Sequence, residues 1–406
     1  MMKRLLYTIL IIAFLATFTM WVSQPQDVSE GHTQQNQTNQ EQAGDQETDG
    51  AIDQHQPEKH DGFDPHKWLA TIMEQHHSLV LLLIMVCAII ALGKGADWLV
   101  EDAVELSLRS GVPRVVVGAT AVSLGTTAPE AAVSVLAAVQ GDSQLALGNA
   151  VGSIICDTGL ILGLACLIRP LAFHLPMVNR QGWIQFASGI LLVLCCIHWL
   201  SLNTVFDPVK GGGTLPQYAG WIFLGLLMLY MIWSVKIARQ ALGEKTASND
   251  EHASEGFVPL LAQLFCAVVI VVVASQFLIS AATVLADRWQ IPPGIIAATI
   301  VAFGTSTPEL IVALTAAWKN QGELAVGNVI GADILNVLFV AGAAASVTPT
   351  GLFAEPDFFR LQFPGMLVIL FVFRIGIWTA QDNRLSRQFG FVLLGVYVAV
   401  TIFSYL

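Results

Sequence analysis

The sequence predicts an all-α polytopic membrane protein. Its core is predicted to be ten transmembrane helices in two inverted five-helix repeats, preceded by an N-terminal signal or anchor helix. Of the 406 residues, 54% are hydrophobic and only 12% are charged, whereas soluble domains carry roughly 25% charged residues. Apolar runs long enough to cross a bilayer recur along the chain. In addition, two long segments 179 positions apart (309 − 130) repeat each other's pattern.

The N-terminal 77 residues divide into an apolar and a polar part. Residues 1–22 combine a basic start at Lys3 and Arg4 with a long apolar run, which is typical of a signal peptide or an uncleaved anchor helix. The lack of a small-x-small cleavage site favours the anchor. Residues 23–77 hold eleven of the 30 acids and six of the nine histidines. This composition predicts a disordered extracytoplasmic linker, and a solvated tail explains the histidines better than a metal site.

Ten further apolar segments are predicted to span the membrane. Five lie in residues 78–235 and five in residues 257–406, and the polar stretch 236–256 between them is predicted to be a loop. The centres of the spans fall near residues 88, 125, 155, 190, 226, 270, 305, 334, 370 and 396.

The basic residues predict how these spans are oriented. If residues 1–4 are cytoplasmic and each span crosses once, twelve basic residues face the cytoplasm and five face outward, as the positive-inside rule requires. The loop 236–256 is then cytoplasmic and the C-terminus external. The cytoplasmic set is Lys3, Arg4, Arg109, Arg114, Arg169, Arg180, Lys236, Arg239, Lys245, Lys319, Arg384 and Arg387; the outer set is Lys59, Lys67, Lys210, Arg288 and Arg360.

An internal repeat relates the two halves. SLGTTAPE (123–130) aligns with AFGTSTPE (302–309), and LALGNAVGSIICD (145–157) aligns with LAVGNVIGADILN (324–336), without a gap. Because each half holds an odd number of spans, the second copy enters the membrane the opposite way round. Inverted repeats of this kind are typical of secondary transporters, whose ion sites lie near the middle of the membrane where the halves meet.

Each copy of the first motif places a proline inside a predicted membrane helix. A proline there removes one backbone donor and clashes with the carbonyl four residues back. Pro129 is therefore expected to free the carbonyl of Gly125, and Pro308 that of Gly304. Freed carbonyls in a membrane are tolerated where protein, water or an ion satisfies them, so each motif predicts a polar site.

Glu130 and Glu309 follow these prolines and are the leading candidates for functional residues. An ionised acid near the middle of a bilayer costs roughly a few kcal/mol or more, so it is normally functional. Helical geometry places two hydroxyl residues on the same face as each glutamate, three and four positions before it. These residues are Thr126 and Thr127 in the first copy and Thr305 and Ser306 in the second.

The segment after each motif adds further oxygen atoms. Asn149, Ser153 and Asp157 recur at every fourth position, roughly on one helix face. Carboxylate, amide, hydroxyl and carbonyl oxygens together suit hard cations such as Ca²⁺ and Na⁺. Hydrogen bonding between helices explains Asn149 equally well, and helix packing is an alternative for Ser153. The repeat mates of the three residues are Asn328, Ala332 and Asn336.

Other residues of these segments receive no site role. Asp333 is an extra acid beside the site segment that could face the cavity, but its helical phase places it off the face of Ala332 and Asn336. Lys94 is expected to reach the interface or to balance charge. A face of small residues is predicted to allow close helix packing; it consists of Gly148, Gly152, Gly159, Gly163, Gly327 and Gly331.

With these motifs in place, the sequence resembles the calcium/cation antiporter superfamily and, within it, the sodium/calcium exchangers. The likeness rests on two alpha-repeats, residues 118–157 and 297–336, and the ten-span frame extends it over about residues 78–406. The resemblance implies exchange of Ca²⁺ for Na⁺ across the cell membrane by alternating access, with the first and sixth core spans sliding across the rest.

The resemblance also implies which residues bind the ions. Two glutamates and two Asn/Asp residues would form a diamond of cation sites, here Glu130, Asp157, Glu309 and Asn336. Flanking sodium sites would use five hydroxyls and two carbonyls. The hydroxyls are those of Thr126, Thr127, Thr305, Ser306 and Ser153, and the carbonyls are those of Ser123 and Ala302.

The chain departs from the family pattern in its small polar run. The usual G-S-N-I reads GSII at 152–155 and GADI at 331–334, and Ala332 lacks the hydroxyl expected of one sodium site. The number of bound sodium ions is therefore left open by the sequence, as is the effect of an Asp at 157 and an Asn at 336.

The charge of the predicted site favours a multivalent cation. Glu130, Asp157 and Glu309 give −3 when ionised; one Ca²⁺ leaves −1, and three Na⁺ leave 0. Protons could replace sodium at such carboxylates, so a Ca²⁺/H⁺ exchanger and a K⁺-dependent Na⁺/Ca²⁺ exchanger of the same fold are the alternatives.

Other functional classes fit the sequence less well. A passive channel would more naturally use a ring of ligands from several subunits, whereas one chain supplies both halves of this site. No nucleophile–base pair repeats together with the acids, so an enzyme is not expected. The predicted partners are Ca²⁺, Na⁺ and the lipid bilayer, with no cofactor, no nucleic acid and a functional monomer.

Overall fold

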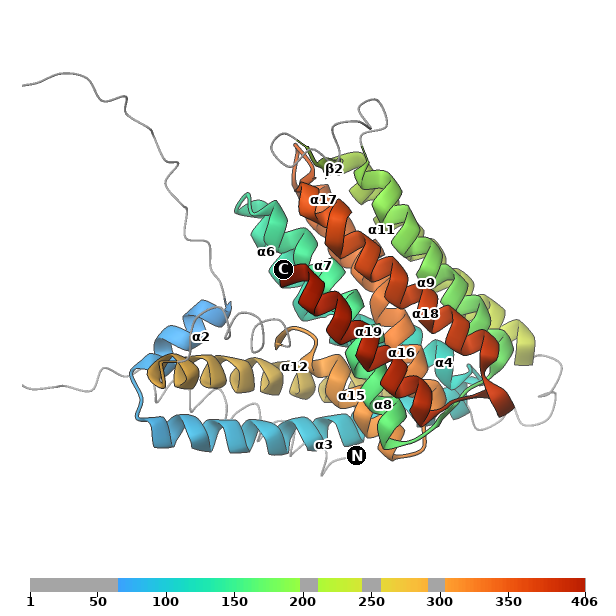
Figure 1. Cartoon of the computed structure of the whole chain (residues 1–406). Helices are drawn as coiled ribbons and strands as arrows, with labels where there is room; N and C mark the ends of the chain where they lie inside the picture. The colour runs from blue at the N-terminus through green and yellow to red at the C-terminus, as the bar shows by residue number, and fades with distance from the viewer. Residues whose placement is uncertain (1–64, 198–210, 243–256, 291–303, 406) are drawn as a thin grey trace, which may run out of the picture.

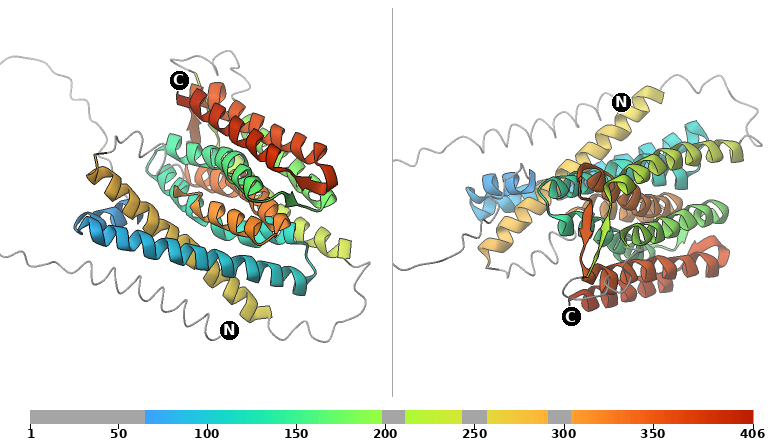
Figure 2. Two further views of the ribbon diagram at one scale, coloured as in Figure 1. Left: turned by 60° about the horizontal axis from the view of Figure 1, so that its bottom comes forward. Right: turned by 90° about the horizontal axis from the view of Figure 1, so that it is seen from above.

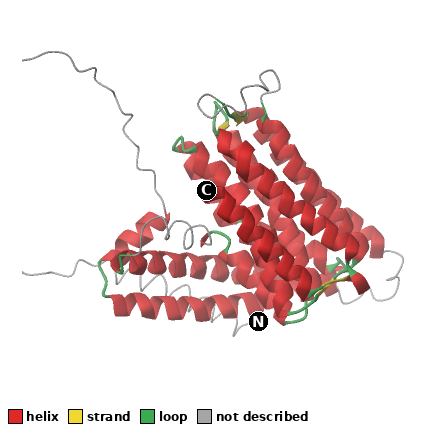
Figure 3. Cartoon of the chain, viewed as in Figure 1, coloured by secondary structure: helices red, strands yellow, loops and turns green. Residues whose placement is uncertain are grey.

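The computed structural model describes residues 65–197, 211–242, 257–290 and 304–405 (Figure 1). The predicted signal or anchor helix 1–22, linker residues 23–64 and Ala302 lie outside these residues. Within them the chain is almost entirely helical, as Figure 3 shows.

The first half of the core consists of helices joined by short connections. The long helix α3 ends where Gly111 adopts a left-handed conformation at φ 66°, which glycine accepts without steric cost. Asp142 caps α7, since its carboxylate accepts a hydrogen bond from the Leu145 amide at 2.9 Å. The elements are α3 (Ser78–Ser110), α4 (Arg114–Val117), η1 (Gly118–Val122), α5 (Ser123–Thr126), α6 (Ala128–Val139), α7 (Ser143–Ile155), η2 (Cys156–Ile161), α8 (Leu162–Ile168), α9 (Leu175–Cys196) and α11 (Gln217–Leu242).

The second half follows the same plan. Its elements are α12 (Phe257–Arg288), α15 (Thr307–Trp318), α16 (Gly322–Leu335), η5 (Asn336–Ala341), α17 (Gly342–Val347), η6 (Phe358–Gln362), α18 (Phe363–Thr379), η7 (Gln381–Asn383) and α19 (Arg387–Tyr405). Of these, η7 is a short 3₁₀ helix, whereas η5 and η6, like η1 and η2 in the first half, are π-helical.

Six described helical segments are long and apolar enough to cross a membrane, or seven if a bent pair counts as one span. The bent pair joins 114–126 to 128–139 at 46°. The prediction of a helical membrane protein is therefore confirmed, while the count of ten spans stays a prediction. The six segments are Ser78–Ser110, Ser143–Ile168, Gln217–Lys236, Val258–Arg288, Gly322–Val347 and Phe358–Thr379.

The helices form a bundle with a pair set at an angle to it. Helices α3 and α12 run side by side and extend away from the bundle, as the views of Figures 1 and 2 agree. The segment α16–η5–α17 lies at the centre of the bundle, where 94% of its most apolar 18-residue stretch is buried. Helices α18 and α19 form the outer layer on the side away from α3 and α12 (Figure 2).

Close packing of α16 depends on two of the predicted small residues. A Cβ atom at Gly327 would lie 2.3 Å from the Val115 carbonyl oxygen, and one at Gly331 would lie 2.4 Å from the Cα of Ala119. Gly152 has open space instead, so the predicted small-residue face is only partly used.

The structure departs from the prediction in two places outside the predicted spans: an additional helix and two short strand pairs. Part of the predicted linker 23–77 forms helix α2 (Pro65–Glu74), whose Leu69 and Met73 are buried against α3 and α12. Two short antiparallel pairs join loops, where the chain leaves its helices and its backbone groups need partners. They are β1 (Leu171–Ala172) with β4 (Arg384–Leu385), and β2 (Gly213–Leu215) with β3 (Leu352–Ala354).

Candidate functional site

Each proline motif lies in the first turn of a described helix. Helix α5 ends at Thr126, and α6 begins at Ala128 with Pro129 in its first turn. In the second copy, α15 begins at Thr307, again with Pro308 in the first turn. Proline suits this position because the first amides of a helix have no partner within it. In the first copy the helical segment bends by 46° just before the proline, and the predicted freeing of the Gly125 and Gly304 carbonyls stays a prediction.

Glu130 and Glu309 lie in the first turns of α6 and α15, facing the middle of the molecule. Their side chains are 1% and 0% exposed. The positive end of a helix dipole favours a carboxylate at this position. The repeated motifs thus bury two acids at equivalent helix starts.

Hydrogen bonds at this point join one repeat to the other. The Thr127 hydroxyl donates to Glu309 Oε1 at 3.2 Å, and the Ser306 and Ser153 hydroxyls lie 3.3 Å apart. The Thr127 hydroxyl of one repeat thus contacts the glutamate of the other repeat, and its predicted place on the face of Glu130 stays a prediction.

Asp157 and Asn336 meet across the same interface. The Asn336 amide donates to Asp157 Oδ2 at 3.5 Å, and both side chains are 1% exposed. Each residue lies in the first turn of a π-helix, Asp157 in η2 and Asn336 in η5. Single π-helical turns within α-helices are frequent at functional sites. The sequence did not predict these turns.

Several oxygens of the four predicted diamond residues have no hydrogen-bond partner among the residues that the structure describes. Buried polar atoms are normally satisfied, so a group of unsatisfied ones requires an explanation. The atoms are both carboxylate oxygens of Glu130, Oδ1 of Asp157, Oε2 of Glu309 and Oδ1 of Asn336. Unpartnered buried atoms are not confined to the predicted ligands, because Asn328 and Asp333 on α16 carry some as well.

The remaining predicted ligands lie in or near the same interface. The Thr126 hydroxyl donates to the Ser123 carbonyl at 3.3 Å, and that carbonyl also accepts the Thr127 amide at 2.8 Å. Both Thr126 and Ser123 are fully buried. The Thr305 hydroxyl donates to the amide oxygen of Asn149 at 3.3 Å.

Asn149 acts as a hydrogen-bonding link, as its alternative interpretation proposed. Its amide nitrogen donates to the Glu130 carbonyl at 3.2 Å and to the Ser134 hydroxyl at 2.9 Å. With the bond from Thr305, Asn149 connects α6, α7 and the start of the second repeat's motif. Its repeat mate Asn328 is buried, and neither of its amide atoms has a hydrogen-bond partner.

A second polar cluster, beside Asp157, consists of Asp333, Thr158 and Gln185. The Thr158 hydroxyl and the Gln185 amide both donate to Asp333 Oδ2. Asp333 thus lies beside the residue that follows Asp157, and its predicted place off the face of Ala332 and Asn336 stays a prediction. The sequence offered one signal for Gln185, an amide side chain within an apolar segment, but it has no polar repeat mate to draw attention to it.

Acidic side chains alone do not complete a metal site here. Among the residues that the structure describes, no three His, Cys, Asp or Glu side chains lie close enough together to hold a metal ion. A cation at the repeat interface would need hydroxyl, amide or carbonyl oxygens as well, which is the donor set that the two motifs supply.

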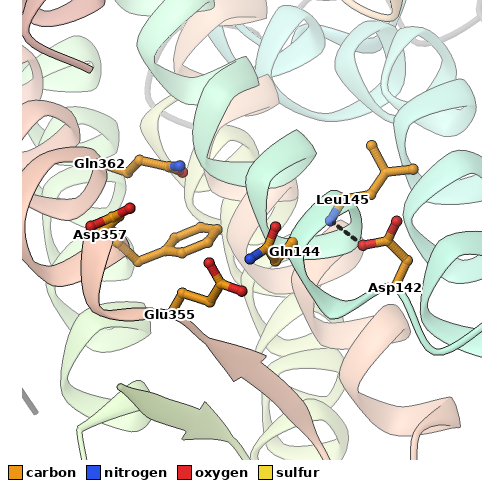
Figure 4. Close-up of a pocket in the computed structure, with 7 residues that line it drawn as sticks. Asp142, Gln144, Leu145, Glu355, Asp357 and Gln362 are labelled. Carbon is orange, nitrogen blue, oxygen red and sulfur yellow. Dashed lines mark hydrogen bonds between the residues drawn. The ribbon is translucent and has the colours of Figure 1, made fainter. Parts of the chain in front are cut away.

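An acidic cavity of about 440 Å³ lies elsewhere, between the start of α7 and η6 (Figure 4). None of the predicted site residues lines it. Its lining consists of Asp142, Gln144, Leu145, Glu355, Asp357, Phe358 and Gln362.

Known proteins share this combination of fold and motifs. A family model described as "Sodium/calcium exchanger protein" matches residues 80–236 and 259–406. The inner membrane protein YrbG of Escherichia coli is 31% identical over 326 residues, which cover 79% of this chain and 95% of that protein. The sodium/calcium exchanger MaX1 of Methanosarcina acetivorans is 28% identical over 344 residues, which cover 79% and 97%.

A solved structure shares the architecture. The sodium-calcium exchanger NCX_Mj, soaked with Na⁺, superposes with a TM-score of 0.66 at 25% identity, covering 80% of this chain and 99% of that one. Together with the apolar spans, these matches identify an integral multi-pass membrane protein. The chain belongs to the sodium/calcium exchanger protein family.

Proposed function

We propose that the protein is a secondary active antiporter that exchanges Ca²⁺ for Na⁺ across the cell membrane by alternating access. The observation that carries the proposal is the set of unpartnered oxygens on Glu130, Asp157, Glu309 and Asn336. Two of these residues come from each repeat, so one ion can contact both halves at once. An ion held between two halves is released to either side when one half moves against the other.

The donor set fits both transported ions. Buried carboxylates need compensating positive charge, and both Ca²⁺ and Na⁺ prefer oxygen ligands. Because the ions compete for the same carboxylates, binding of one excludes the other, which couples their movements. Thr126, Thr127, Ser153, Thr305 and Ser306, with the Ser123 and Ala302 carbonyls, are the proposed additional sodium ligands.

We propose ten core spans in two inverted repeats, functioning as a monomer in the bilayer. Two of the spans would be the bent segment 114–139 and its repeat mate, which includes α15. Each of the two contains a proline motif, so neither is one long straight helix. Helices α9 and α19 would complete the count. The family match on both halves, 80–236 and 259–406, supports the duplication.

Na⁺ is favoured as the counter-ion over H⁺. The named relative MaX1 and the structural neighbour NCX_Mj are sodium/calcium exchangers. A more distant relative, the sodium/potassium/calcium exchanger 2 of Gallus gallus, is 24% identical over 35% of this chain.

Replacement of Glu309 by Gln tests the assignment of the site. Glu309→Gln removes one charge and one ligand oxygen with little change in shape, so sodium-dependent Ca²⁺ uptake into proteoliposomes should fall by at least about tenfold. Glu323→Gln, the same chemical change in the first turn of α16 and outside the site, should leave uptake within about twofold. Equal uptake by Glu309→Gln and the wild type would contradict the proposal.

A further inference from the structure

We propose that Asp333 is a positioning residue for ion exchange, which holds the π-helical turn carrying Asp157 through a hydrogen bond from Thr158. The inference rests on the proposed function for its effect on transport, but its structural part can be measured without transport. It assigns a role to a buried acid that the ligand set leaves out.

The contacts of Asp333 tie three separate elements together. Asp333 lies on α16, Thr158 lies in η2 directly after Asp157, and Gln185 lies on α9. Both Thr158 and Gln185 donate to the same oxygen, Oδ2, and Gln185 also donates to the Thr158 hydroxyl at 3.1 Å. All three side chains are at most 1% exposed. A buried network of this kind restricts the positions that its members can take.

The network leaves the neighbouring ligand available for an ion. Oδ1 of Asp157 has no hydrogen-bond partner, and Oδ2 has only the long contact with Asn336. Thr158 is therefore anchored by Asp333 and not by the adjacent carboxylate. Partners that orient ligand-bearing segments commonly change metal affinity by about 10- to 100-fold when they are removed.

Only one of the two repeats has this support. With the offset of 179 positions, the mates of Asp333, Thr158 and Gln185 are Ile154, Val337 and Pro364, none of which offers a side-chain hydrogen bond. The neutral ligand Asn336 therefore lacks the polar support given to Asp157. The network thus supports the acidic member of the pair and not the amide member.

Gln185 is in turn part of a polar row on α9. Gln181, one turn earlier, accepts a hydrogen bond from the Tyr230 hydroxyl at 2.9 Å and donates to the Ser234 hydroxyl at 2.8 Å. The Tyr230 hydroxyl also reaches the Ala119 carbonyl in η1 at 3.3 Å. One face of α9 thus contacts α11 through Gln181, close to the π-helical turn η1. The same face contacts the π-helical turn η2 through Gln185.

Three variants separate hydrogen bonding from charge. Asp333→Leu removes both bonds, Thr158→Val removes the donor to Asp333 with little change in shape, and Asp333→Asn keeps an acceptor oxygen but loses the charge. Asp333→Leu and Thr158→Val should raise the KM for Ca²⁺ by about tenfold or more with a smaller change in maximal rate. Asp333→Asn should stay within about twofold, as should the control Ser346→Ala, whose hydroxyl donates to the Ala343 carbonyl of its own helix.

Amide hydrogen exchange of residues 156–161 gives the second readout. Loss of the bond should speed amide hydrogen exchange of these residues in Asp333→Leu and Thr158→Val, whether or not the protein transports ions. Failure of the proposed function would show separately, as absence of Na⁺/Ca²⁺ transport by the wild type. If Asp333→Leu does not fold, Thr158→Val decides. An unchanged rate of amide hydrogen exchange together with an unchanged KM for Ca²⁺ in Thr158→Val would overturn the inference. Asp333→Asn as defective as Asp333→Leu would also overturn it, since the charge would then act directly.

Discussion

Glu130, Asp157 and Glu309 place three carboxylates in the interior of a membrane protein, close to hydroxyl and amide oxygens from both repeats. No basic side chain forms an ion pair with any of them among the salt bridges found in the described residues. Uncompensated buried charge is costly, and a bound cation would remove that cost. The three carboxylates are therefore the residues on which the proposed ion binding depends most.

Exchange of the acid and the amide between repeats tests the charge account. Asp157→Asn leaves the site with one carboxylate fewer, so Ca²⁺ uptake should fall by about tenfold or more, because affinity depends on the charge of the ligands. Adding Asn336→Asp restores the number of carboxylates and should recover part of the uptake. Full recovery is not expected, because Ile154 and Val337 give position 336 no polar support.

Initial rates of Ca²⁺ uptake in proteoliposomes measure both variants. Asn336→Asp alone serves as the control for the new acid. A double variant no more active than Asp157→Asn would contradict the charge account and would show that the position of the acid matters more than the charge of the site.

The elements of the site are held together by the close approach of α16 to η1 and α5, the two elements that precede Thr127. Without a Cβ atom, Gly331 lets α16 touch η1 and α5; a Cβ there would lie 2.4 Å from the Cα of Ala119 and 2.5 Å from the Ser123 hydroxyl. These are the residues just before the break that positions Thr127. Helix packing at glycine therefore determines where the hydroxyl of one repeat meets the glutamate of the other.

Gly331→Ala should destabilise the protein through this contact. Forcing a methyl group into a tightly packed core typically costs about 1–3 kcal/mol, so the midpoint of thermal unfolding in detergent should fall. Gly225→Ala on α11, where a Cβ would meet no atom within 4 Å, is the matched control and should not lower it. An unchanged midpoint for Gly331→Ala would contradict the packing account.

The repeats and the buried acids could be predicted from the sequence, but fewer of the residues around them could. Glu130 and Glu309 could be predicted because each is a charge in an apolar segment and because the motif occurs twice. The helix breaks before Pro129 and Pro308 could not, since a proline inside a helical pattern is compatible with either a kink or a new start. Gln185 was missed because its side chain donates to Thr158 and Asp333, which come from distant parts of the chain.

In the whole molecule, the site lies where the repeats cross, while α3 and α12 pack together and extend away from the bundle (Figure 1). One end of each helix joins α2 in a separate hydrophobic cluster, whereas the rest of α3 and α12 packs into the main core. Their extensive contact with each other suits the two helices to slide together against the rest of the bundle. This arrangement fits alternating access around a fixed ion site.

Ca²⁺ uptake into proteoliposomes loaded with Na⁺, with K⁺ or with acid tests the central claim most directly. The internal ion is the variable, and Glu309→Gln vesicles give the background. The account predicts rapid uptake only when an outward Na⁺ gradient is present, and loss of that uptake when the gradient is removed. Uptake driven by a pH gradient alone, with no response to Na⁺, would contradict sodium/calcium exchange.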